Sequence, residues 1–175
     1  MFRHKTITIL AAGTLAATVW VCRAAPIMSR PALSDEIISL AGLDTFKVEV
    51  DTRSTLTDKI ELSAKRVKSD IEKLVAQRGF KTSDLEGAAT LSIKIRLHGN
   101  PKYPDVIVCR FHISLEQDAI VKRLNKTLRL PTYALAHSSL TDKDDAAKDV
   151  DRQIELLVRL FLTRVKSANE LKLGS

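Results

Sequence analysis

Two stretches of the chain place apolar residues at helical spacing. In the first, Ser63 precedes a segment that Arg78 and Gly79 close, with an apolar residue at every third or fourth position. Serine favours the N-cap of a helix, and glycine favours the left-handed position after its end. The second stretch runs over at least four turns near the C-terminus. The apolar positions of the two stretches are Val67, Ile71, Leu74 and Val75, and then Val150, Ile154, Leu157, Val158, Phe161 and Val165. Both predict an amphipathic helix packed on a sheet.

Four other stretches alternate apolar and polar residues, which is the period of a strand with one wet face. They cover residues 46–51, 91–97, 107–116 with an extension to about 121, and 128–137. Pro131 lies within the last stretch and cannot donate to a strand ladder, so this strand is predicted to be an edge strand or to contain a bulge. A bulge at Pro131 also explains why Tyr133, Leu135 and His137 follow in the opposite phase.

The element order is therefore β-α-β-β-β-α. Two amphipathic helices and a mainly antiparallel sheet predict an α+β fold, a two-layer sandwich with both helices on one face. We expect a single α+β domain over residues 44–171, preceded by a linker with a short helix over residues 25–43. Ser34 is the expected N-cap of that helix, Asp35–Ala41, and Gly42 its end.

The first residues have the three parts of a secretory signal peptide in order. A basic start, Met1–Lys5, leads into the uncharged run Thr6–Cys22, and small residues follow, with cleavage expected after Ala24. The predicted signal peptide, 1–24, places the protein in the periplasm or outside the cell. A retained anchor is an alternative, although this run of 17 residues is shorter than the roughly 20 that span a bilayer. Lipidation of Cys22 is another alternative, and we expect membrane contact only in these two cases.

Removal of the signal changes the charge and the cysteine content. Arg3, Lys5 and Arg23 leave with it, so the net charge falls from +7 to +4, which is too low for a nucleic-acid-binding surface. Only Cys109 remains, so no internal disulfide can form. Cys109 shares its strand phase with Phe111, which predicts a buried thiol that forms a thiolate poorly.

Three histidines remain, and their placement argues against a metal site. With a turn centred near Lys102, His98 pairs with residue 106, and His112 lies six residues further on, about 20 Å away. Metal ligands must lie within about 2.1 Å of the ion, so we expect no metal and no cofactor. His137 is followed by two serines, but neighbouring strand residues point to opposite faces, and no Gly-x-Ser-x-Gly elbow is present. No catalytic residue is predicted.

The polar face of the central hairpin is the one candidate site. In the same register Lys94 lies opposite Arg110, with Arg96 beside them. Directly opposed like charges are unfavourable, so this cluster predicts a possible anion-binding face for a phosphate or a sulfated sugar. The alternative is a solvated sheet face with splayed side chains. Separately, Asn125-Lys126-Thr127 matches the N-glycosylation pattern.

Four features together resemble a group of small exported bacterial proteins. They are Leu40-Ala41-Gly42-Leu43, a helix led by Ser63 and ending at Arg78-Gly79-Phe80, the alternation from Leu91 to Leu97, and a final helix with Phe161 and Ala168-Asn169. The architecture is also remotely similar to the amino-terminal domain of TolB and to LptE-like lipopolysaccharide-transport lipoproteins. This resemblance implies a binding module of the bacterial envelope, although a fold alone does not fix a function.

We therefore expect an exported, non-enzymatic binding or accessory protein of the cell envelope, whose partner is an envelope component or a protein. The exposed sheet face or the Pro131 edge strand would serve as its binding surface. The alternatives are a small exported hydrolase without a recognisable motif and a membrane-tethered structural protein.

Overall fold

The computed structural model describes residues 34–54, 56, 60 and 62–173, all within the compact unit Ser34–Ser175. The predicted signal peptide, its cleavage after Ala24 and the lipidation of Cys22 lie outside the described residues. In the described part of the chain, no helix is long and apolar enough to cross a membrane.

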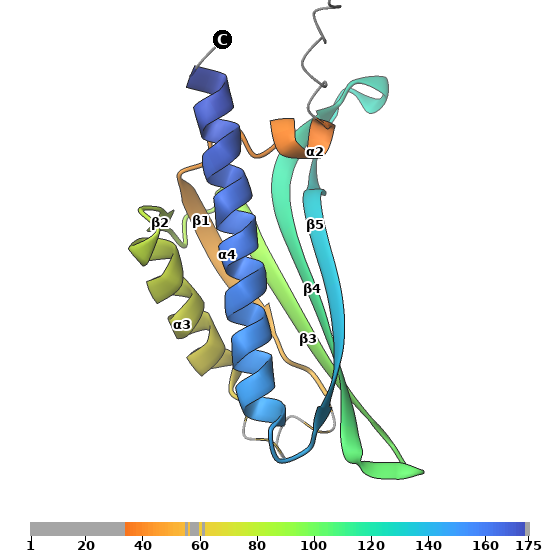
Figure 1. Cartoon of the computed structure of the whole chain (residues 1–175). Coiled ribbons are helices and arrows are strands. Elements are labelled where there is room, and N and C mark those ends of the chain that lie inside the picture. The colour runs from red at the N-terminus through yellow and green to blue at the C-terminus, as the bar shows by residue number, and fades with distance from the viewer. Residues whose placement is uncertain (1–33, 55, 57–59, 61, 174–175) are drawn as a thin grey trace, which may run out of the picture. The chain divides into compact units, whose positions relative to one another are not determined.

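A five-stranded sheet of order β2-β1-β3-β4-β5 forms one layer (Figure 1). The strands are β1 (Thr45–Asp51), β2 (Lys81–Thr82), β3 (Thr90–Asn100), β4 (Tyr103–Val121) and β5 (Lys126–Asp142). The long ladders, β3–β4 and β4–β5, are antiparallel, whereas β1 pairs in parallel with β2 and β3. This confirms the predicted α+β sandwich; the two-residue strand β2 is an addition that the sequence did not predict.

The helices α3 (Ala64–Gln77) and α4 (Ala146–Leu173) cover one face of this sheet, and no helix of the described residues covers the other face, called the helix-free face below (Figure 1). Their buried side chains meet those of the inner sheet face in one hydrophobic core. Ser63 caps α3, because its Oγ accepts a hydrogen bond from the N–H of Arg66 at 3.4 Å. Gly79 follows with φ +84°, the left-handed conformation predicted for it.

The first helix is shorter than predicted. It covers Asp35–Ile38 (α2), and the chain continues in turns instead of reaching Ala41. The side chain of Ser34 makes no capping hydrogen bond; its carbonyl oxygen accepts from the N–H groups of Ile37 and Ile38 instead. Four residues without a side-chain cap form little more than one turn, because helix nucleation is costly.

Strand β5 is an edge strand, as Pro131 predicted. Its ladder with β4 shifts at the expected place: Tyr133 pairs with Leu115 and Pro131 with Glu116, which leaves Thr132 as an extra residue. The extra residue compensates for the change in alternation along β5, so that Leu130 and Tyr133 lie on the same side of the sheet.

The expected register of the β3–β4 hairpin is wrong by two residues. Arg96, not Lys94, lies opposite Arg110, and Lys94 lies opposite His112. The turn is tight, with Asn100 paired to Tyr103, and three additional residues of β4 then interrupt the ladder before Ile107 pairs with Gly99. Pro104 begins this interruption because it has no N–H to donate.

Candidate binding face

The helix-free face of the sheet brings the three predicted cations together. Arg96 and Arg110 are direct cross-strand neighbours, and Lys94 lies two residues before Arg96 on β3. Side chains at directly opposite positions stand about 5 Å apart at their Cβ atoms. The corrected register therefore keeps all three residues in one cluster and makes the arginine pair its closest contact.

Arg96 is neutralised by a carboxylate from the neighbouring parallel strand. Its Nη2 donates to Asp51 Oδ2 at 2.7 Å, and its Nη1 donates to the Asp51 carbonyl oxygen at 3.1 Å. Asp51 also accepts from Arg53 Nε at 3.0 Å. The hydrogen bonds from Arg53, and next those from Arg96, hold the pKa of Asp51 well below its usual range. Arg96 is therefore already partnered and held in place.

Lys94 and Arg110 differ from Arg96 in this respect. Both side chains are exposed, and within the described part of the chain neither makes an ion pair or hydrogen bond. Together with Arg96 they line a cavity of about 320 Å³, to which β5 contributes Ala136, His137 and Ser138. The side chains of Ala136 and Ser138, which face the same side as the cations, are short. The short residues leave room above the strand, so a ligand can approach both free cations from the same side.

The other end of the same face holds a second cavity, of about 630 Å³, with a different electrostatic character. Lys47 pairs with Glu49 at 2.7 Å, and Arg129 pairs with Asp118 at 3.4 Å. Arg129 also donates to the carbonyl oxygen of Ala88 at 2.7 Å. The cations of this second cavity are thus already paired with protein groups. The cavity beside Lys94 and Arg110 is therefore the one suited to an external anion.

The histidines do not converge. His98 lies opposite Val108, which is four residues, or about 13 Å, from His112, so the separation is shorter than the expected 20 Å but still excludes a shared ion. His137 lies on the helix side and stacks on Phe111 at 6.2 Å between ring centroids. Among the described residues, no group of three or more histidine, cysteine or acidic side chains is placed to hold a metal.

Cys109 is fully buried, as its strand phase predicted. Burial raises the pKa of its thiol to about 11, and the Asp149 carboxylate adds to the effect. A thiol of this kind is almost wholly protonated at neutral pH, so it is a core residue and a poor nucleophile. Ser138 and Ser139 pair with Arg110 and Cys109 on opposite faces, which separates the two hydroxyls as expected.

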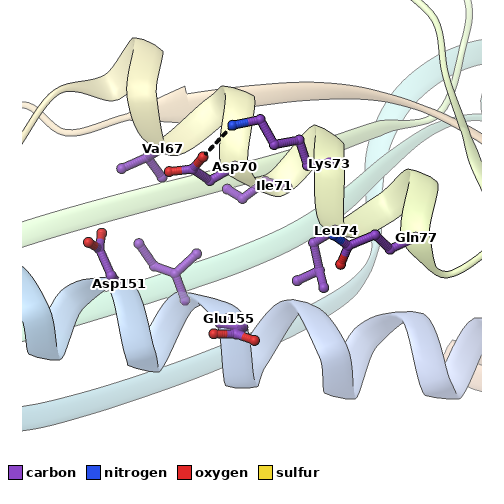
Figure 2. A pocket seen from close by; sticks show the side chains of 9 residues that line it. Val67, Asp70, Ile71, Lys73, Leu74, Gln77, Asp151 and Glu155 are labelled. Carbon is purple, nitrogen blue, oxygen red and sulfur yellow. Dashed lines mark hydrogen bonds and ion pairs between the residues drawn. The ribbon is translucent and has the colours of Figure 1, made fainter.

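A third cavity, of about 310 Å³, lies between α3 and α4 and was not predicted (Figure 2). Val67, Ile71, Leu74 and Ile154 contribute apolar side chains to it, with charged groups among them. Lys73 Nζ pairs with Asp70 at 3.1 Å, and Arg66 pairs with Asp151 at 2.9 Å. In the sequence these polar positions were the expected wet sides of two helices, and no signal marked a groove. All of its charged lining side chains have ion-pair partners, so the groove offers no described free charge that would orient a charged ligand.

Comparisons with known proteins add little to this geometry. No protein-family model matches the chain, and no curated protein matches it. Among solved structures, a minor lipoprotein from Acinetobacter baumannii is similar at 16% sequence identity and a TM-score of 0.30, over 66% of this chain and 93% of the lipoprotein. At that TM-score the likeness carries no argument about the role of this chain.

Proposed function

We propose that this protein is an exported, non-enzymatic binding protein of the cell envelope, which captures an anionic ligand on the helix-free face of its sheet. One observation carries the proposal: Lys94 and Arg110 are exposed beside Arg96 and have no partner among the described residues, and they border a cavity that the short side chains Ala136 and Ser138 leave open. The export and the envelope location rest on the amino-terminal sequence pattern.

The electrostatics favour a ligand with more than one anionic oxygen. Two arginines at directly opposite strand positions repel each other, and the Asp51 carboxylate relieves only the Arg96 side. An anion that bridges Arg110 and Lys94 would relieve the remaining repulsion. Guanidinium groups bind phosphate and sulfate oxygens in a bidentate manner, which makes these groups the best fit.

The size of the cavity supports a small ligand or the charged end of a larger one. About 320 Å³ is at the lower end of the range of small-molecule sites, roughly 300–1,000 Å³. The lining residues include no acid, so no carboxylate competes with an external anion inside the cavity.

The test is calorimetric titration of the protein with pyrophosphate and with a sulfated disaccharide, at low and at high salt. A double variant, Lys94→Ser with Arg110→Ser, removes both free cations. We expect it to bind at least about tenfold more weakly, because each charge-assisted hydrogen bond contributes about 1.5–3 kcal/mol. Asp51→Asn removes the competing carboxylate from Arg96, and we expect it to bind more tightly than the parent.

The matched control is Lys65→Ser with Lys148→Ser, which removes the same net charge from exposed positions on the two helices. It should bind both probes as the parent does. Equal losses in the two double variants would show a nonspecific effect of net charge and refute the proposed site. Release of orthophosphate from pyrophosphate during the titration would indicate the exported hydrolase instead.

A further inference from the structure

The β4–β5 hairpin continues beyond the rest of the sheet. Strand β3 ends its pairing with β4 at Thr90 and Glu116, whereas β4 and β5 remain paired as far as Val121 and Lys126. Past Glu116 these two strands therefore have only each other as ladder partners, and they form a projecting ribbon (Figure 1). The 3-10 turn η2, Lys122–Leu124, connects them at the end.

This end of the ribbon, residues 119–130, is called the hairpin tip below. Large apolar side chains on it are open to solvent: Ile120 at 73% exposure, Leu124 at 49%, and Leu128 and Leu130 at 37% each. Leu128 and Leu130 lie on the side of the sheet that faces the core, and the pairing with β4 places Ile120 on the other side. No helix of the described residues lies over them to form a core, and a two-stranded ribbon alone gains little stability from such residues. Because these side chains lie on both sides of the ribbon, the end of the hairpin, and not one of its faces, is the apolar surface that marks an interaction site.

The charges of the hairpin tip have a single sign. Lys122, Arg123 and Lys126 lie among the apolar residues, and the tip contains no acidic residue. Within the part of the chain that the structure describes, these three side chains make no ion pair. Asn125, in the glycosylation pattern, has φ 47°, which asparagine tolerates better than most residues, so the turn itself accounts for its presence.

The amino-terminal segment joins the domain at the base of this hairpin. Gln117 Nε2 donates to the carbonyl oxygen of Ser39 at 3.0 Å, and Ser39 Oγ donates to that of Thr132 at 3.1 Å. These bonds tie the end of α2 to both strands of the hairpin, five residues after Ser34, the first described residue.

We infer that the hairpin tip is a membrane-contacting element that binds the surface of an anionic lipid bilayer. Apolar side chains that enter the headgroup region, surrounded by basic residues that face lipid phosphates, form the usual pattern of interfacial binding. A second copy of the chain is a poor occupant, because two tips would bring six unpaired cations together. From the sequence, membrane contact was expected only if the signal segment is retained or Cys22 is lipidated. The hairpin tip would provide a contact that persists after the signal is cleaved.

The test is co-sedimentation of the exported protein with vesicles of phosphatidylcholine, with and without phosphatidylglycerol. The parent should bind only the anionic vesicles. A charge variant carries Lys122→Glu, Arg123→Glu and Lys126→Glu, and an apolar variant carries Ile120→Ser and Leu124→Ser. Each basic residue strengthens binding to an anionic surface roughly fivefold, so the charge variant should lose at least about a hundredfold. The apolar variant should lose at least tenfold.

Matched controls lie at the opposite end of the domain, in the β3–β4 turn and near the start of α4 (Figure 1). The charge control combines Lys102→Glu, Lys143→Glu and Lys148→Glu, and the apolar control combines Tyr103→Ser and Leu140→Ser; all five positions are exposed. Both controls should bind within twofold of the parent. All variants share one amino terminus, so any contribution of the leader cancels in the comparison.

An inserted reporter provides a direct readout. The single tryptophan, Trp20, lies in the predicted signal, so Ile120→Trp adds a fluorophore at the tip. Its emission should shift to shorter wavelength with anionic vesicles, and that of Leu140→Trp should not. Equal binding to both vesicle types, or equal losses in tip and control variants, would overturn the inference. Concentration-dependent dimers that only the tip variants abolish would assign the tip to a second copy instead.

Discussion

Phe161 of α4 connects the two ends of the sheet through the helical layer. Its ring lies 5.6 Å from that of Phe46 on β1 and 5.6 Å from that of Tyr133 on β5, measured between centroids. Strands β1 and β5 are separated in the sheet by β3 and β4, so this one side chain joins strands that do not pair. Phe161 is fully buried, which makes Phe161→Leu an informative substitution.

The expected cost follows from these contacts. Leucine keeps most of the apolar volume but loses two aromatic pairs, each of which contributes about 0.5–1.5 kcal/mol beyond its buried area. We therefore expect Phe161→Leu to lower the free energy of unfolding by about 1–3 kcal/mol. Phe161→Ala adds a cavity and should cost about 3–5 kcal/mol. Urea titration followed by far-ultraviolet circular dichroism gives both values. The m-value, the slope of the unfolding free energy against urea concentration, should stay the same in both variants.

Phe111→Leu is the matched control. Phe111 is buried at 2% exposure, and among the described rings it contacts only His137, an exposed residue. Its replacement should cost less than about 1.5 kcal/mol, the usual cost of a volume-conserving change. If the two leucine variants lose equal stability, or if Phe161→Leu costs less than about 0.5 kcal/mol, the bridging role assigned to the aromatic pairs is refuted.

Three further predictions concern single polar groups. Asn169 Oδ1 accepts from the N–H of Gly42 at 2.5 Å, and its Nδ2 donates to the carbonyl oxygen of Leu43 at 2.9 Å. Asn169→Ala should therefore lower the free energy of unfolding by about 1–3 kcal/mol in the same urea titration. A loss below about 0.5 kcal/mol would mean that solvent replaces both bonds. The thiol of Cys109 has a folded pKa of about 11, above the unfolded value of about 8.5, so its contribution to stability is complete below pH 8.5 and is lost as the pH rises toward 11. Cys109→Ala should therefore flatten the alkaline decline in urea midpoint, and native protein should resist iodoacetamide at pH 8; rapid labelling would contradict the burial. The folded pKa of Asp51 is depressed, so its contribution is present above the unfolded pKa of about 3.9 and is lost as the pH falls through the folded value. Asp51→Asn should cost about 1 kcal/mol at pH 7 and progressively less below pH 4, and a cost independent of pH would exclude the ion pairs as its cause.

The element order was predictable because each element has its own short-range pattern. The helical stripe from Val150 to Val165 and the alternation from Leu91 to Leu97 each follow from one period, and a bulge beside Pro131 follows from a missing N–H. The register of the β3–β4 hairpin did not follow, because periodicity is unchanged when a strand slips by two residues. The additional residues after Tyr103 produce such a slip without altering which side chains face the core.

The same limit applies to the candidate face. Alternation placed Lys94, Arg96 and Arg110 on one wet face correctly, because face depends on phase alone. Which of these cations is neutralised depends on the parallel pairing of β1 with β3, which sets Asp51 beside Lys94 and within reach of Arg96. A long-range pairing of this kind has no signature in a local pattern.

The hairpin tip shows how an exposed apolar surface can arise from an ordinary strand pattern. Leu128 and Leu130 alternate with polar residues as core-facing side chains do, and the bulge at Thr132 keeps them in phase with the buried Tyr133. They are exposed because β3 stops at Thr90, so the core ends before the strands do.

The two cationic surfaces, at Lys94 and Arg110 and at the hairpin tip, lie on separate parts of one domain, and the two proposals can be tested separately. Lys94→Ser with Arg110→Ser should leave vesicle binding unchanged, and the tip charge variant should leave pyrophosphate binding unchanged. If both variants weaken both activities, a general effect of net charge explains the data better than two sites do.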